Sequence, residues 1–176
     1  MTASSTMKEV LEEFPGAQRA LFRKYHIGGC SSCGFQPEEK LAELCARNGN
    51  LAVDEVIGHI RTSHEADLKM QIAPSELADW KKREPALKIV DIRTREEHEA
   101  ARIDGTVLFS QELMQEMLGR WKREQPLVIV DHHGKKSMDA AAYFAGHGFQ
   151  NVRALRGGID AWSREVDPKV PRYELE

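Results

Sequence analysis

Cysteine is scarce in this sequence, aromatic residues are few and neither sign of charge dominates. The 176 residues include three Cys and 7% aromatics, and 25 Lys and Arg stand against 28 Asp and Glu. Three cysteines cannot all pair, so a disulfide framework of the secreted type is excluded. The balanced charge gives no basic footprint, and we expect no nucleic-acid partner.

Long apolar stretches are also missing. The run Leu127–Val130 has four residues, whereas roughly 20 are needed to cross a bilayer. The opening letters MTASSTMKEV contain no basic region followed by an apolar stretch, so no secretory signal is visible. We therefore expect a cytoplasmic protein without a membrane partner.

The length of the chain allows one domain and a second, smaller one. The pattern of apolar residues changes at the polar stretch 63–69. Residues 1–65 are predicted to form a small all-α domain, because apolar residues recur at helical spacing and strand patterns are missing. The four expected helices begin near Thr6, Pro15, Pro37 and Val53. A glycine-containing loop at 26–34 separates the second helix from the third.

Residues 70–176 alternate short apolar runs with helical stretches. Strands are predicted at Leu87–Asp91, Leu127–Asp131 and Asn151–Leu155, the first two each preceded by Pro. Helices are predicted at 74–83, 96–101, 111–122, 136–146 and 159–164. This alternation is typical of an α/β domain in which a parallel sheet is buried between helices.

One loop of this domain has the position and composition of an anion site. It follows the strand at Leu127 and leads into a helix, so its N–H groups and the helix dipole favour negative charge. In open parallel sheets, ligands bind at such strand ends. The candidate residues are Asp131, His132, His133, Gly134, Lys135 and Lys136.

Five motifs in this order resemble the rhodanese family, over about residues 70–173. They are Asp91-Ile92-Arg93-Thr94, the loop from Asp131 to Lys136 followed by Ser137 and Ala140–Ala142, Gly148-Phe149-Gln150-Asn151-Val152, Gly157-Gly158-Ile159-Asp160-Ala161-Trp162, and the tail from Glu165 to Tyr173. The resemblance implies a three-layer α/β/α fold and sulfur-transfer chemistry. It also implies that Asp91 and Arg93 make polar contacts that brace the loop.

The loop departs from the family pattern Cys-x-x-Gly-x-Arg at both ends. In the family the Cys thiolate carries the sulfane sulfur as a persulfide, which the carboxylate of Asp131 cannot do. Lys136 replaces the two-pronged Arg with a point charge. We therefore expect conventional turnover to be lost and the Asp131 carboxylate to accept the loop N–H bonds itself. An aspartate nucleophile for phosphate is an alternative.

The two histidines of the loop also have alternatives. Asp-His-His after a strand resembles the phosphoesterases named for that triplet, in which Asp and His bind manganese, but their further Asp motifs are missing. A metal site formed by His132 and His133 alone is a second possibility. The simpler interpretation places both imidazoles toward solvent at a binding surface.

The spacing Cys30-Ser31-Ser32-Cys33 lets both sulfurs meet within one turn, as a disulfide or on one metal. Residues 6–62 resemble a small helical disulfide domain that also occurs beside hybrid-cluster proteins. A redox-active or sulfur-accepting pair is the preferred interpretation. An iron–sulfur or zinc site at Cys30 and Cys33, with Cys45 or His26, and a purely structural pair are the alternatives.

Cys45 lies on the apolar stripe of a predicted helix and is expected to be buried. Neither a metal nor a cofactor is expected. The leading functional hypothesis is a sulfur or redox relay through Cys30 and Cys33, with the rhodanese-like domain docking a thiol- or persulfide-carrying protein. The rivals are a non-catalytic binding or regulatory module, and a sulfurtransferase in which an N-terminal Cys reaches the C-terminal pocket.

Overall fold

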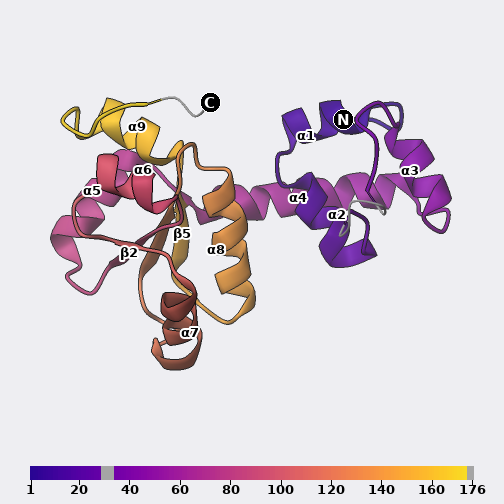
Figure 1. Cartoon of the computed structure of the whole chain (residues 1–176). Helices are drawn as coiled ribbons and strands as arrows, with labels where there is room; N and C mark the ends of the chain where they lie inside the picture. The colour runs from indigo at the N-terminus through magenta and orange to yellow at the C-terminus, as the bar shows by residue number, and fades with distance from the viewer. Residues whose placement is uncertain (29–33, 174–176) are drawn as a thin grey trace. The chain divides into compact units, whose positions relative to one another are not determined.

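The computed structural model describes residues 1–28 and 34–173. The chain divides into two compact units, Met1–Leu68 and Lys69–Glu176 (Figure 1). The polar stretch 63–69 lies within a long helix that ends at Met70 and is followed directly by the first strand.

The N-terminal unit is helical. Its helices are α1 (Met7–Glu13), α2 (Ala17–Tyr25), α3 (Leu41–Arg47) and α4 (Val53–Met70). Helix α1 begins with a capping box, in which the Glu9 N–H donates to the Thr6 hydroxyl at 3.3 Å and the Glu9 carboxylate accepts from the Thr6 N–H at 2.8 Å. These reciprocal bonds satisfy two backbone donors that a bare helix end leaves unpaired.

The third helix starts later than predicted, at Leu41 and not near Pro37. The intervening residues bond to the segment before and within α1, because the Met7 N–H donates to Glu39 O at 2.8 Å and the Leu41 N–H donates to Ser5 O at 2.9 Å. These pairings across the unit take the place of the helical bonds that the pattern predicted.

The core of this unit comes from one stripe of each helix. Cys45 is 1% exposed, which confirms the expected burial, and it is a free thiol. The other buried residues of the cluster are Met7, Val10, Phe14, Ala17, Leu21, Ile27, Leu41, Leu44, Val56 and Ile60.

The C-terminal unit is an α/β domain with a fully parallel five-stranded sheet of order β1-β5-β4-β2-β3. Its elements are β1 (Gln71–Ile72), α5 (Pro74–Arg83), β2 (Lys88–Asp91), α6 (Arg95–Ala100), β3 (Thr106–Leu108), α7 (Gln111–Arg120), β4 (Leu127–Val130), α8 (Lys136–Gly146), β5 (Val152–Leu155) and α9 (Gly158–Glu165). The three predicted strands are β2, β4 and β5. The edge strands β1 and β3 were not predicted, because two or three residues are too short to carry a pattern.

Alternate residues of each strand face opposite layers. In β2, Ile89 packs into the cluster that contains Leu77 of α5 and Trp162 of α9, whereas Val90 packs with Met117 of α7 and Phe144 of α8. Figure 1 shows α5 and α9 on one side of the sheet and α8 on the other. The domain is therefore the expected three-layer α/β/α sandwich.

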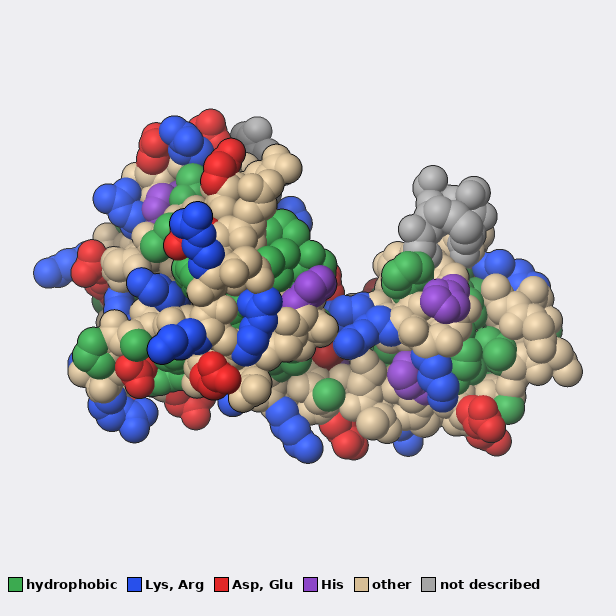
Figure 2. All heavy atoms as spheres, turned by 90° about the horizontal axis from the view of Figure 1, so that it is seen from below, with side chains coloured by type: hydrophobic (Ala, Val, Ile, Leu, Met, Phe, Trp, Pro, Cys, Tyr) green, Lys and Arg blue, Asp and Glu red, His purple; other side chains and the backbone are tan. Residues whose placement is uncertain are grey.

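Charged side chains of both signs are interspersed over the visible surface (Figure 2). Within the described residues, no helix combines the length and the apolar character that crossing a membrane requires.

Candidate functional site

The six-residue loop 131–136 leaves the centre of the sheet. Strand β4 lies between β5 and β2, and all four of its residues are buried. Asp131 follows Val130 directly, and α8 begins at Lys136. The loop therefore lies at the carboxyl edge of the sheet, where ligands of open parallel sheets bind.

The carboxylate of Asp131 accepts hydrogen bonds from loop N–H groups, as the sequence predicted, and from one hydroxyl besides. Its Oδ1 accepts from the Gly134 N–H at 2.6 Å and from the Ser137 hydroxyl at 2.9 Å, and its Oδ2 accepts from the Lys136 N–H at 2.8 Å. The residue is 5% exposed. A carboxylate at the start of α8 is stabilised both by these donors and by the helix dipole. The side chain of the loop thus occupies the loop's own anion cradle.

Two glycines allow the loop to pack closely against β5 and α9. Gly134 has φ +85°, and a Cβ there would lie 2.7 Å from the Gly157 N and 2.9 Å from the Leu155 O. Gly158 has φ +60°, and a Cβ there would overlap the carbonyls of Asp131 and His132. Both positions therefore exclude a side chain for reasons of space and of backbone conformation.

The backbone of the loop also caps α9. The Ile159 N–H donates to Asp131 O at 2.9 Å, and the Asp160 N–H donates to His132 O at 3.2 Å. Two of the N–H groups that a helix start leaves unpaired are thereby satisfied. The loop consequently supports two helices, α8 through a side chain and α9 through main-chain carbonyls.

The histidines of the loop differ in their surroundings. His133 is exposed, as predicted, but His132 is only 5% exposed, so the expectation of two solvent-facing imidazoles is wrong for His132. Its ring centroid lies 4.1 Å from that of His133 and 4.5 Å from that of Tyr173. Burial lowers the pKa of His132, and the nearby His133 lowers it further. Tyr173, from the C-terminal segment, packs against the His132 ring, and Gly158 of α9 lies close to its backbone.

Asp91 and Arg93 form a buried ion pair beside the loop. Arg93 Nη2 lies 2.6 Å from Asp91 Oδ2, and Arg93 also donates to Ala101 O at 2.6 Å. His98 Nδ1 lies 3.0 Å from the same Asp91 oxygen. Burial raises the pKa of Asp91, but the hydrogen bonds from Arg93 and His98 outweigh it, so that the net pKa lies below its usual range.

The ion pair is joined to the loop through β-sheet pairing. Asp91 lies opposite Val130, the residue before Asp131, and the Ile92 N–H donates to Val130 O at 2.9 Å. The two acidic residues therefore stand at the ends of adjacent strands. Lys135 and Lys136, the two cations of the loop, are exposed.

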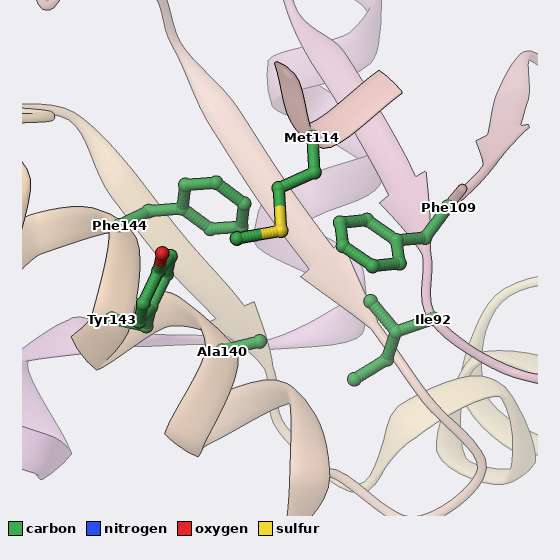
Figure 3. Close-up of a pocket in the computed structure, with 6 residues that line it drawn as sticks. All are labelled: Ile92, Phe109, Met114, Ala140, Tyr143 and Phe144. Atoms are coloured by element: carbon green, nitrogen blue, oxygen red, sulfur yellow. The ribbon is translucent and has the colours of Figure 1, made fainter. Parts of the chain in front are cut away.

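An apolar pocket of about 300 Å³ opens on the α7–α8 side of the sheet (Figure 3). Its lining residues come from the ends of β2 and β3 and from the two helices: Ile92, Phe109, Met114, Ala140, Tyr143 and Phe144. Ala140 lies one helical turn after Lys136, so the pocket and the loop cation share one face of α8. No local sequence pattern predicts this pocket, because its residues are spread over four elements.

Two further residues of the site were not predicted as such. Ser137 is fully buried and donates to Asp131, and Tyr173 bonds to Arg93 at 2.6 Å, eighty positions away. The small polar residue after the loop was a usable signal for Ser137. No local pattern connects Tyr173 with Arg93.

Cys30 and Cys33 lie outside the described residues. Among the described residues, no group of three His, Cys, Asp or Glu is arranged to hold a metal ion. Burial raises the pKa of the Cys45 thiol, which keeps it protonated and unreactive at neutral pH.

The rhodanese-like domain model matches residues 73–165. The thiosulfate sulfurtransferase GlpE of Pseudomonas aeruginosa is 33% identical over 103 residues, which cover 58% of this chain and 91% of that protein. The adenylyltransferase and sulfurtransferase UBA4 of Candida albicans is 24% identical over 169 residues, covering 91% of this chain but only 38% of that protein. The structure of the human single domain sulfurtransferase TSTD1 matches with 20% identity and a TM-score of 0.49, covering 55% of this chain and 96% of that one.

The domain model and the match to GlpE place the chain in a known class: it belongs to the rhodanese-like domain family.

Proposed function

We propose that this protein is a sulfur or redox relay in which Cys30 and Cys33 carry the thiol chemistry and the rhodanese-like domain docks a partner. The single observation that carries the proposal is the Asp131 carboxylate, which takes hydrogen bonds from Gly134, Lys136 and Ser137 inside the cradle. The family pattern has a cysteine at this position. A carboxylate there cannot form a persulfide, so turnover at this loop is lost.

The remaining thiol chemistry falls to the Cys-x-x-Cys pair. Cys45 is 1% exposed, and burial raises its pKa, so it is a poor nucleophile and a poor sulfur carrier. Cys30 and Cys33 are the two other cysteines of the chain. Their spacing places two thiols within one turn, so that either sulfur can receive a sulfane sulfur and hold it as a persulfide.

The transfer step is a displacement at sulfur. A thiolate of the pair attacks the outer sulfur of a donor such as thiosulfate, the sulfur–sulfur bond of the donor breaks, and sulfite leaves with the electron pair. The cysteine persulfide that forms then passes its outer sulfur to an acceptor thiolate, which regenerates the cysteine. No oxidant or reductant is consumed in this exchange.

The partner is a thiol- or persulfide-carrying protein. The exposed Lys135 and Lys136 offer positive charge to a thiolate or persulfide group. The apolar pocket lined by Met114 and Phe144 offers space for an apolar side chain of the same partner (Figure 3). Iron–sulfur or zinc binding at Cys30 and Cys33 remains the alternative use of the pair.

A non-catalytic binding or regulatory module is the second candidate. It is also favoured because the Asp131 carboxylate already occupies the anion site of the loop. A sulfurtransferase in which an N-terminal cysteine reaches the C-terminal domain is the third. The three candidates differ in where sulfur is carried: on Cys30 or Cys33 in a relay, on no cysteine in a binding module, and on an N-terminal cysteine with loop-dependent turnover in the transferase.

The test is to incubate the reduced full chain with thiosulfate or inorganic polysulfide and to map persulfides by mass spectrometry. The relay predicts label on Cys30 or Cys33, loss of label when the labelled cysteine or both are changed to Ser, and unchanged label in Cys45→Ser. Metal analysis of anaerobically purified protein distinguishes a cluster from free thiols. A protein that is metal-free and fully reduced, yet takes no label from either donor, would overturn the relay.

A further inference from the structure

The chain after α9 forms a strap (residues 166–173) that returns across the domain to the loop. The strap is anchored in its middle, where the Ser163 hydroxyl donates to Val170 O at 2.6 Å and the Val170 side chain is 7% exposed. Nearer its end, Arg172 Nε lies 2.8 Å from Asp160 Oδ1 of α9. Tyr173 follows and is the last residue that the structure describes.

Tyr173 connects the strap with three other parts of the site. Its hydroxyl donates to Glu97 Oε1 at 2.8 Å and accepts from Arg93 Nη1 at 2.6 Å. Its ring centroid lies 4.5 Å from that of His132. The tip of the strap thus contacts the end of β2, helix α6 and the loop that follows β4.

The imidazole of His132, beside Tyr173, lacks hydrogen-bond partners among the described residues. It is 5% exposed, and within the described part of the chain neither Nδ1 nor Nε2 has a hydrogen-bond partner. A buried polar group without a partner destabilises the fold, and an unpaired buried charge destabilises it more. The closed arrangement therefore holds the neutral imidazole with some loss of stability, and the charged imidazolium would destabilise it more.

We propose that His132 is the proton-sensitive element of a latch, and that its protonation releases Tyr173 and opens the strap from the loop. The imidazolium needs an acceptor for each N–H, which the closed arrangement does not supply. The ring can obtain acceptors by moving into water, which requires Tyr173 to leave its face. It can also pair with Glu97, which requires Glu97 to give up the Tyr173 hydroxyl. Either route breaks a contact that holds the tip of the strap.

The surroundings of His132 lower the pKa of its imidazole on balance, as the latch requires. Burial and His133, on the same loop, lower the pKa of His132, and Arg93 at the end of β2 lowers it as well. Glu97 of α6 and Asp160 of α9 act in the opposite direction but do not reverse the shift. Both carboxylates are already engaged, Glu97 by Tyr173 and Asp160 by Arg172 and Arg164.

Burial raises the pKa of Tyr173 to about 12, so its hydroxyl stays protonated throughout the range in which His132 titrates. In the open state His132 is exposed and regains its ordinary pKa of about 6.5. The open state therefore binds the proton more tightly, and acid favours opening. The latch is fully closed above about pH 6.5 and is weakened as the pH falls below that value, until the closed form is itself protonated.

This proposal concerns the strap and the loop alone, and it stands whether or not Cys30 and Cys33 carry sulfur. The experiment is NMR spectroscopy of the full chain between about pH 7.5 and about pH 5. We expect the nuclear Overhauser effect between the His132 and Tyr173 rings to be strong at the upper end and to disappear at the lower end. Exchange of the Val170 amide, corrected for its intrinsic rate, should rise several-fold relative to amides of β4.

Three variants distinguish the protonation of His132 from other effects of acid on the protein. His132→Phe keeps a ring against Tyr173 without a titratable nitrogen, and its ring contact should persist at the lower pH. His147→Gln, which removes an exposed histidine at the end of α8 that does not act on His132, should keep the wild-type response. Tyr173→Ala should show the exchange of the open strap at every pH.

Two results would overturn the latch. One is a His132–Tyr173 contact that persists in the wild type after the His132 ring has become protonated. The other is a loss of the strap contact with the same midpoint in His132→Phe as in the wild type, which would assign the response to another group, such as His98.

Discussion

The Ser137 hydroxyl donates to Asp131 Oδ1 at 2.9 Å, and this bond connects the first turn of α8 with the end of β4. The same oxygen accepts from the Gly134 N–H at 2.6 Å. The donors are thus arranged for an anion at this point, whichever side chain or ligand provides it. The cradle is a property of the loop backbone and Ser137, and the occupant is a property of position 131.

If Asp131 replaces a sulfur carrier, restoring the carrier should restore activity. We predict that the double variant Asp131→Cys, Lys136→Arg gains thiosulfate:cyanide sulfurtransferase turnover, measured as thiocyanate formation, from a background level in the wild type. The cradle N–H groups would stabilise the thiolate, and the guanidinium would bind the thiosulfate oxygens. Asp131→Ser with Lys136→Arg, which has the same cradle without a thiol, is the matched control. A double variant that is folded but inert would contradict the assignment of position 131.

Removing the carboxylate should destabilise the domain. In Asp131→Ala the Gly134 and Lys136 N–H groups and the Ser137 hydroxyl lose their acceptor, and we expect a loss of roughly 1–3 kcal/mol in the free energy of unfolding. Urea denaturation measures this quantity. Lys135→Ala, at an exposed side chain of the same loop, should change stability by less than about 0.5 kcal/mol. Equal stabilities of Asp131→Ala and the wild type would show that water replaces the carboxylate at no cost.

The two glycines of α8 and its loop should respond in opposite directions to alanine. Gly134→Ala introduces a Cβ 2.7 Å from the Gly157 N at φ +85° and should destabilise the domain. A Cβ at Gly146, the last residue of α8, meets nothing within 4 Å, and there alanine should stabilise by up to about 1 kcal/mol. Thermal unfolding of both variants tests this contrast, and a neutral Gly134→Ala would show that the loop can move away from β5.

The buried pair Asp91–Arg93 should make stability depend on acid pH. The net pKa of Asp91 lies below its usual range in the folded state, so the folded state binds its proton less tightly than the unfolded chain does. Its contribution is complete above the unfolded pKa of about 3.9 and is lost as the pH falls through the folded pKa. In Asp91→Asn this part of the acid dependence should be missing, and urea titrations at neutral and acid pH measure it. An unchanged slope against pH in the variant would assign the acid dependence to other carboxylates.

Arg93→Lys tests the other residue of the same buried ion pair. Arg93 donates to the Asp91 carboxylate from both Nε and Nη2 and also donates to Ala101 O, a geometry that a single ammonium cannot reproduce. Breaking a buried pair outright costs about 3–5 kcal/mol, and we expect Arg93→Lys to lose part of that amount in urea denaturation. A fully stable Arg93→Lys variant would show that the lysine is solvated in place.

The sequence was sufficient for the sheet interior and for the contacts of Asp131. The runs that became β4 and β2 are apolar because strands of a parallel sheet are buried on both faces, and this signal is local. The N–H contacts of the cradle were predictable because they lie within six consecutive residues, from Asp131 to Lys136.

The errors concern contacts between distant segments. His132 is buried because Tyr173, forty-one positions later, packs against its ring, and no periodicity of the loop records that contact. Helix α3 begins at Leu41, later than predicted, because residues 37–41 bond to residues 5–8 and do not form helical bonds. Both features depend on tertiary pairing, which overrides local preference.

The carbonyl of residue 131 caps α9 through Ile159, and every amino acid has that carbonyl. The support that this position gives to the second helix is therefore independent of its side chain. A lineage could exchange one reactive group for another at position 131 while the loop kept its path, and a single substitution could reverse the exchange. At this position the carbonyl supports α9 whatever the side chain is, whereas the side chain determines both the chemistry and the support of α8.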